Sequence, residues 1–112
     1  MDCLFCKIIA GKIPSKEIFR DDEVLAIADI DPQAPTHILV MPRKHYGQIA
    51  EVFDAGGAPL AAKLLSVATR LGQKSGADGF RLVINTGELG GQTVDHVHVH
   101  VLSGRHMTWP PG

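Results

Sequence analysis

The chain of 112 residues has no long apolar run, no excess of charge of either sign and only 2 cysteines. No segment approaches the length of a membrane span, so we expect no membrane partner. With 11 basic and 12 acidic residues the formal net charge is -1, which gives no electrostatic case for a nucleic-acid partner. Repeats and low-complexity tracts are also lacking. The remaining composition is that of one globular domain over residues 1–112.

The two cysteines, Cys3 and Cys6, are spaced as Cys-x-x-Cys. The chain starts acidic rather than basic, and no long apolar stretch follows that would act as a targeting segment. We therefore expect a cytoplasmic protein, in which a structural disulfide is disfavoured. The pair is then a metal half-site, a redox pair or a coincidence. Because no βαβ pattern surrounds it, a thioredoxin-like role is weakly supported.

The pattern of apolar residues, prolines and glycines predicts an α+β fold with an antiparallel sheet, since strands and helices do not alternate regularly. A short helix is expected over residues 4–10, ended by Gly11. A long helix starts near Pro59 and ends at Gly76. The expected strands cover residues 17–20, 24–29, 37–41, 80–85 and 96–101.

Three histidines, His96, His98 and His100, stand at alternate positions with valines between them. On a strand this spacing puts the imidazoles on one face and the valines on the other. A glycine-containing loop with possible anion donors comes directly before them. Metal binding or polar packing would also use such histidines. A neutral imidazole can attack phosphorus and form a covalent intermediate, so we favour a phosphoryl-transfer site.

This run resembles the signature of the histidine triad family, His-x-His-x-His followed by two apolar positions. Other segments are similar to the family's further motifs, and the end of the chain, Trp109-Pro110-Pro111-Gly112, resembles its nucleotide-binding Hint branch. The resemblance covers essentially the whole chain. It implies an antiparallel sheet of about five strands with one long and one short helix, paired into a two-fold homodimer. The further segments are residues 29–30, 32–37, 85–87 and 90–92.

The Hint branch contains purine nucleoside phosphoramidases, which hydrolyse the P–N bond of adenosine monophosphate joined to an amine such as lysine. The resemblance implies that His98 is the nucleophile and forms a nucleotidyl-histidine intermediate. His100 would contact phosphate and support the leaving group, because an amine must gain a proton to leave. His37 and His96 would orient or polarise the site. No cofactor would be required for catalysis.

The resemblance also implies nucleotide contacts in the loop before the triad and at one carboxylate. Asp29 would accept hydrogen bonds from ribose hydroxyls, which a carboxylate can take from two oxygens. Successive backbone N–H groups form a physically sound phosphate cradle. Thr93 stands where Hint proteins often carry serine, so the hydroxyl is kept and a methyl group is added. The phosphate-binding residues implied in this way are Asn85, Gly91, Gln92, Thr93 and Val94.

An apolar pocket for the base is implied as well, although apolar residues at such positions usually belong to a core. Ile27 stands where many Hint proteins place an aromatic residue, so weaker stacking could loosen base selectivity. Trp109 is either a core aromatic or a tail residue that reaches towards the site of the partner subunit. The residues implied for the pocket are Phe5, Ile8, Ile27, Ile30 and Leu39.

Some bacterial histidine triad proteins with this cysteine pair resemble a zinc site. Zinc needs four ligands, commonly two cysteines and two histidines. Cys3, Cys6, His45 and His96 would supply them, with an unmetallated thiol pair as the alternative. If His96 ligates zinc, it cannot also carry protons, and the chemistry is left to His98 and His100. Zinc would then be structural.

Three other functions stay open. The dinucleoside polyphosphate hydrolase branch of the same family is compatible with the segment 91–94, but the Trp-Pro-Pro-Gly end and the short chain disfavour it. A nucleotide-binding scaffold dimer without physiological catalysis is a second alternative. A zinc-binding interaction module is a third. Comparing the turnover of an adenosine phosphoramidate with that of diadenosine triphosphate would distinguish a phosphoramidase from the hydrolase branch. Metal analysis together with activity after chelation would test the zinc-binding module.

Overall fold

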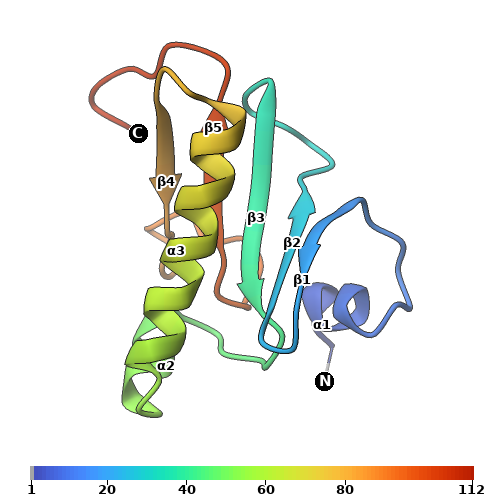
Figure 1. Ribbon diagram of the computed structural model, residues 1–112. Coiled ribbons are helices and arrows are strands. Elements are labelled where there is room, and N and C mark those ends of the chain that lie inside the picture. Colours follow the sequence, from blue (N-terminus) through green and yellow to red (C-terminus); the bar gives the residue numbers. More distant parts are fainter. Residues whose placement is uncertain (1) are drawn as a thin grey trace.

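The computed structural model describes residues 2–112, so only Met1 of the predicted domain lies outside the described residues. The fold is α+β, as predicted, with all five expected strands present (Figure 1). The helices are α1 (Leu4–Ile9), α2 (Ile49–Asp54) and α3 (Ala58–Ser75). The strands are β1 (Glu17–Arg20), β2 (Val24–Ala28), β3 (Thr36–Pro42), β4 (Phe80–Val83) and β5 (Val99–Ser103).

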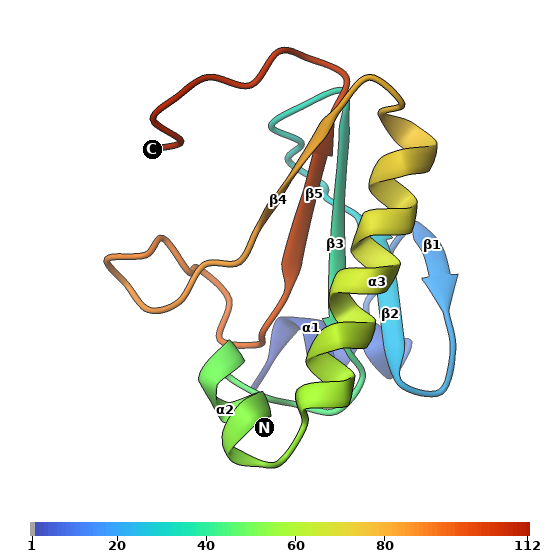
Figure 2. The ribbon, with the colours of Figure 1, turned by 60° about the vertical axis from the view of Figure 1, so that its left-hand side comes forward.

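The five strands form one sheet in the order β1-β2-β3-β5-β4, and every neighbouring pair is antiparallel. The first and last strands in this order, β1 and β4, are therefore the two edges. Figure 2 shows that the loop after β4 and the C-terminal tail both extend beyond the β4 edge. The central strand β3 pairs with β2 on one side and with β5 on the other, which brings residues 36–40 beside residues 99–103.

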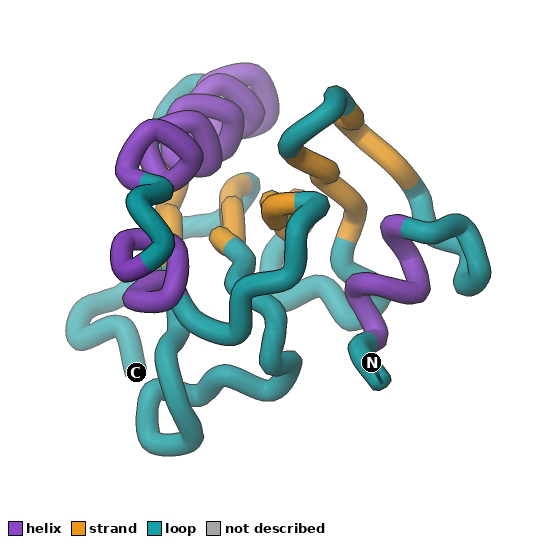
Figure 3. The backbone as a smooth tube through the Cα atoms, turned by 90° about the horizontal axis from the view of Figure 1, so that it is seen from below, coloured by secondary structure: helices purple, strands orange, loops and turns teal. Residues whose placement is uncertain are grey.

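Helices cover both faces of the sheet, and the alternation of side chains along β2 explains why. Val24 and Ala26 pack in the cluster that contains Leu64 and Ala68 of α3, whereas Leu25 and Ile27 pack in the cluster that contains α1 residues. Successive strand residues point to opposite faces, so a strand buried on both faces is apolar throughout. Figure 3 shows α3 and α1 on opposite sides of the row of strands.

The predicted histidine strand over residues 96–101 is only partly correct, because β5 begins at Val99. The ladder between β3 and β5 ends at the pair Val40 and Val99. Two residues further along β3 stands Pro42, which has no N–H to donate to a ladder. The N–H of Val97 instead donates to the carbonyl of Tyr46 at 2.7 Å. The valines of this run are buried, and so are His96 and His98.

The structure adds one short helix, α2, to the two that were predicted. Six residues with one buried side chain, Val52, are too few to give a clear helical period. The carboxylate of Glu51 accepts a hydrogen bond from the N–H of Gln48 at 2.7 Å and so caps the first turn. None of the helices formed by residues 2–112 combines the length and the apolar character that crossing a bilayer demands.

Candidate functional site

A cavity of about 230 Å³ lies between α1, the loop that follows it and the sheet face that carries Ile27 and Leu39. Its wall is largely apolar, with His98, His100 and Asp29 as the ionisable side chains. All five residues predicted for the base pocket line it. The predicted site residues that line this cavity are Phe5, Ile8, Ile27, Asp29, Ile30, Leu39, Thr93, Val94, His98 and His100.

Five further lining residues were not predicted: Leu4, Ile13, Pro14, Ser15 and Ala28. Three of them belong to the loop between α1 and β1, which the sequence marks only as a turn by its proline. A sequence pattern gives the local conformation of such a loop but not the element against which it folds. The apolar Ile13 next to Pro14 was the one signal available, because an apolar residue in a loop often covers a cluster.

Other predicted nucleotide contacts lie outside the cavity lining of the described residues. The carboxamide of Gln92 ties loops together: it donates to the carbonyls of Gly47 at 2.6 Å and Val94 at 3.0 Å, and accepts from the N–H of Gly87 at 3.0 Å. The N–H of Gly91 donates to the carbonyl of Glu88 at 3.0 Å. The remaining two residues outside the lining are Asn85, half-buried, and Trp109, exposed.

His98 has a ring orientation that leaves one nitrogen with a free lone pair. Its Nδ1 lies 2.7 Å from the carbonyl oxygen of His96. A carbonyl only accepts, so Nδ1 carries the proton and Nε2 carries the lone pair. Only 6% of His98 is exposed, and the Phe5 ring meets its ring edge-on, with 5.0 Å between centroids. The sheet and α1 thus hold a neutral imidazole whose Nε2 is its nucleophilic atom.

His100 has the opposite tautomer, and two successive hydrogen bonds that run through His37 set it. The N–H of Gln33 donates to Nδ1 of His37 at 3.1 Å, so the proton of that ring is on Nε2. Nε2 of His37 lies 2.9 Å from Nδ1 of His100 and donates to it. His100 must then carry its proton on Nε2. The centroids of the His98 and His100 rings are 4.8 Å apart, so a ring with a lone pair on Nε2 neighbours a ring with a proton on Nε2.

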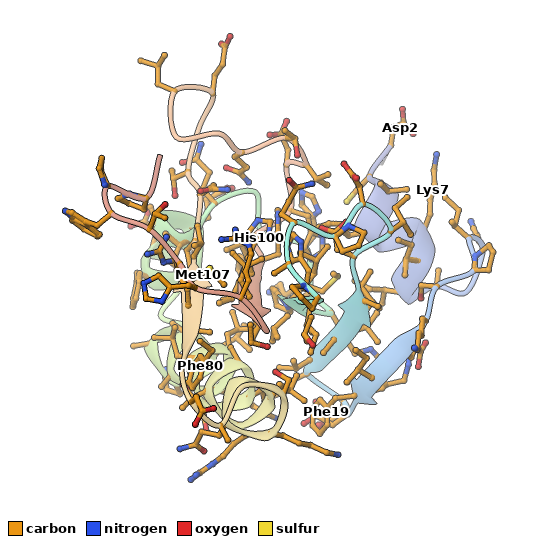
Figure 4. All side chains as sticks on the ribbon, turned by 90° about the horizontal axis from the view of Figure 1, so that it is seen from above. Asp2, Lys7, Phe19, Phe80, His100 and Met107 are labelled. Carbon is orange, nitrogen blue, oxygen red and sulfur yellow. The ribbon has the colours of Figure 1, made fainter. Side chains whose placement is uncertain are left out.

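Burial keeps these rings neutral. It lowers the pKa of His100 to about 4, with His98 and His37 adding to the effect and Asp29 opposing it. Burial also lowers the pKa of His98 and that of His37, again against the carboxylate of Asp29. Near neutral pH all three imidazoles are therefore uncharged, as the tautomers above require. Figure 4 shows His100 close to the centre of the molecule, whereas Asp2 and Lys7 lie at its rim.

A second group of side chains, Cys3, Cys6, His45 and His96, has its four ligand atoms within 4.8 Å of one another. Nδ1 of His96 lies 3.2 Å from Nδ1 of His45, 3.5 Å from the sulfur of Cys3 and 3.6 Å from that of Cys6. Tetrahedral zinc with ordinary bond lengths has N···N edges of about 3.4 Å and S···N edges of about 3.6 Å. The observed spacings fit those edges.

The tautomer of His96 fits a metal as well. Its Nε2 lies 2.8 Å from the carbonyl oxygen of Pro42, to which it must donate. Nδ1 therefore keeps its lone pair towards the cysteines, which is the arrangement found in metal-bound histidines. Both cysteines are free thiols and none of the described residues forms a disulfide with them. The four residues predicted as metal ligands thus form a group that can hold a metal ion.

Asp29, His37 and His100 also have candidate ligand atoms within 4.8 Å of one another. Here the hydrogen bonds argue against a metal ion. Since the N–H of Gln33 occupies Nδ1 of His37, the Nε2 atom that faces the other two groups carries a proton and not a lone pair. Its distance of 3.5 Å from the Asp29 carboxylate is that of a weak polar contact. This group is a hydrogen-bonding unit.

Comparison with known proteins agrees with this geometry. The family model of the HIT domain matches residues 10–107. The 14 kDa zinc-binding protein of Brassica juncea is 45% identical over 99% of this chain and 100% of its own. The crystal structure of a HIT family hydrolase from Legionella pneumophila is 50% identical, covers 99% of this chain and 100% of its own, and has a TM-score of 0.93. A Zn-bound histidine triad family protein from Mycobacterium smegmatis is 34% identical, covers 94% of this chain and 76% of its own, and has a TM-score of 0.83. The chain belongs to the histidine triad (HIT) family.

Proposed function

We propose that this protein is a purine nucleoside phosphoramidase, which hydrolyses the P–N bond of adenosine monophosphate joined to an amine. The observation that carries the proposal is the pair of opposite tautomers at the cavity wall: Nε2 of His98 carries a lone pair, Nε2 of His100 carries a proton, and the two ring centroids are 4.8 Å apart. A nucleophile near a hydrogen-bond donor suits the displacement of an amine from phosphorus. The name of the Legionella relative, a hydrolase, supports the reaction class.

In the first step Nε2 of His98 attacks phosphorus, so that a new N–P bond forms as the bond from phosphorus to the amine breaks. The departing nitrogen takes a proton from solvent, because an unprotonated amide ion is a very poor leaving group, and the Nε2–H of His100 donates a hydrogen bond to that nitrogen as the bond breaks. His100 keeps its proton, since a neutral imidazole that lost it would become an imidazolate anion. His37 supports this donor: its Nε2–H donates to Nδ1 of His100 and keeps the proton of that ring on the far nitrogen. The products of the step are the free amine and a nucleotidyl-His98.

In the second step water attacks the phosphorus of the intermediate, and the N–P bond to His98 breaks. The attacking water returns one proton to solvent, and His98 recovers its lone pair on Nε2. Adenosine monophosphate is released. Each turnover thus consumes one water, and the proton taken up in the first step is released in the second.

The remaining cavity residues suit a nucleoside. Asp29 would accept hydrogen bonds from the ribose hydroxyls, and one of its oxygens already takes the N–H of Asp31 at 2.8 Å, which fixes the carboxylate. Apolar side chains of α1 and the sheet would hold the base. Thr93 and Val94 line the same cavity and would contact the phosphate, together with Asn85 and the neighbouring loop. A purine nucleotide is therefore the proposed substrate class.

We also propose that Cys3, Cys6, His45 and His96 hold a structural zinc ion. Zinc would cross-link α1, the segment after β3 and the start of the triad. Catalysis itself would need no cofactor, because the proposed nucleophile and the proposed hydrogen-bond donor are both imidazoles. The zinc-binding relatives from Brassica juncea and Mycobacterium smegmatis support the ion, and free, closely spaced thiols suit the proposed cytoplasmic location.

A two-fold homodimer is part of the proposal. The edge strand β4 has one unpaired side among the described residues. The C-terminal tail and the loop after β4 both extend past this side (Figure 2). Both segments carry a large, exposed apolar side chain, Trp109 and Leu89. An unpaired edge flanked by such side chains favours pairing with a second copy. Trp109 would then approach the site of the partner.

The experiment that tests the function compares adenosine 5′-phosphoramidate of an alkyl amine with diadenosine triphosphate. We expect kcat/KM for the phosphoramidate to be higher by about 100-fold, because the hydrogen bond from His100 matters most for a poor leaving group such as an amine. Quenched wild-type enzyme should contain a nucleotidyl adduct on His98, identified by mass spectrometry. A preference for diadenosine triphosphate would favour the hydrolase branch of the family, and turnover of neither compound would favour a binding protein.

A further inference from the structure

The segment after β5, which contains Gly104 and Arg105, contacts the loop before β3, and Gln33 of this loop sets the tautomer of His37. Nε of Arg105 donates to the carbonyl of Gln33 at 3.0 Å, and its Nη1 donates to the carbonyl of His106 at 3.2 Å. Beside it Gly104 has φ +95° and approaches Pro35 so closely that a Cβ there would lie 2.8 Å from the ring. Arg105 and Gly104 together hold this loop against the end of β5.

Gln33 uses its two backbone polar groups in different directions. Its carbonyl accepts from Arg105, and its N–H donates to Nδ1 of His37. These groups flank one Cα atom, so holding the carbonyl limits the rotation that would turn the N–H away. The other side of the loop is fixed by Asp29, whose N–H donates to the carbonyl of His37 at 2.9 Å. Arg105 is the only side chain of the described residues that bonds to the Gln33 carbonyl.

We propose that Arg105 is a positioning residue for the N–H that His100 presents to the leaving group, an inference that rests on the proposed function and deepens it. The path runs from Arg105 through the Gln33 backbone to His37 and then to His100. If the Gln33 N–H turned away, Nδ1 of His37 could carry the proton and Nε2 the lone pair. His100 would then donate from Nδ1 and present a lone pair to the cavity. The site would lose this hydrogen-bond donor without losing its nucleophile.

This proposal predicts a defect that depends on the leaving group. An alkyl amine is a poor leaving group and depends strongly on a hydrogen-bond donor at its nitrogen, whereas 4-nitrophenolate leaves as a stable anion and depends on that donor less. For Arg105→Ala we expect kcat for an AMP alkylamidate to fall by about 10-fold or more, with KM within about twofold of the wild type. Turnover of AMP 4-nitrophenyl ester should fall by less than about threefold. Arg105→Lys keeps a charged donor and should recover part of the loss.

Arg70→Ala is the matched control, because Arg70 is exposed on α3 and, within residues 2–112, its side chain bonds only to Gln73. It should turn over both substrates like the wild type. Equal losses on the two substrates in Arg105→Ala, or unchanged turnover of both, would overturn the proposal, since a general structural defect does not discriminate between leaving groups.

A second measurement does not depend on turnover or on the alanine variant. Imidazole ¹⁵N chemical shifts should give one tautomer for His37 in the wild type, with the proton on Nε2, and a mixture in Arg105→Lys or Arg105→Ala. A single unchanged tautomer in folded variants would refute the role of Arg105. Failure of the proposed function looks different: the wild type would then turn over neither substrate, while the tautomer of His37 would still respond to Arg105.

Discussion

The carbonyl oxygen of His96 accepts the Nδ1 proton of His98 at 2.7 Å, while the ring of His96 faces Cys3, Cys6 and His45. One residue thus belongs to both sites, its ring to the group that can hold a metal and its backbone to the proposed nucleophile. Phe5, which lies between the two cysteines in the chain, meets the rings of His96 and His98 edge-on. We expect disturbance of the metal group to reach His98 through these contacts.

Replacement of the proposed nucleophile tests the covalent route. We expect His98→Asn to lower kcat by about 1,000-fold or more while the Kd of adenosine monophosphate stays within about threefold, because the apolar wall and Asp29 are unchanged. Steady-state assays measure kcat, and calorimetric titration measures the Kd of adenosine monophosphate. A variant that keeps more than a tenth of the wild-type rate would contradict the mechanism. His106→Asn, which alters an exposed histidine outside the cavity lining, is the control.

Removal of one proposed zinc ligand should weaken the fold. In Cys6→Ala we expect the zinc content to fall and Tm to drop by roughly 5–10 °C, which corresponds to a loss of about 1–2 kcal/mol in the free energy of unfolding. Elemental analysis and thermal unfolding are the measurements. Treatment with a chelator should bring the wild type down to the Tm of the variant and leave the variant unchanged. Equal zinc content in the two proteins would show that the group does not bind the ion.

The buried imidazoles should make stability depend on pH. In the folded protein the pKa of His100 is about 4, against an ordinary value of 6.5. Between these values the unfolded chain binds more protons than the folded one, so the free energy of unfolding falls as pH falls from 6.5 towards 4. Urea unfolding at several pH values measures the slope. His100→Gln should flatten it relative to a wild type of equal zinc content, and a slope identical in both proteins would count against the lowered pKa.

The cavity should discriminate weakly between purines. Few side chains around the cavity could form hydrogen bonds to the edge of a base. In the loop after α1, Ser15 is the lining residue with a hydroxyl group. An apolar wall separates similar ligands only modestly, so we expect kcat/KM for adenosine and guanosine phosphoramidates to agree within about 10-fold. Ser15→Ala should shift this ratio by less than about threefold. A preference of 1,000-fold for one base would mean that polar groups read the base after all.

Prediction from the sequence worked where a pattern repeats or where local chemistry limits the backbone. The long helix was expected from its Pro59 start and its Gly76 end, and α3 runs from Ala58 to Ser75. The prediction placed His96 and His98 in a strand with His100, and this was wrong for the first two. Pro42 stands on a neighbouring strand and ends the ladder there, which no pattern within residues 96–101 could reveal.

The sequence by itself determined the α+β class, the alternation that buries the valines of the triad and the set of chemistry-bearing residues, because these depend on local periodicity and residue type. Only the tertiary structure decided what each imidazole can do. The proton positions follow from backbone groups distant in the chain, such as the Pro42 carbonyl, which accepts from His96 across 54 residues. A tautomer is set by the partner that a ring nitrogen meets, and folding alone chooses that partner.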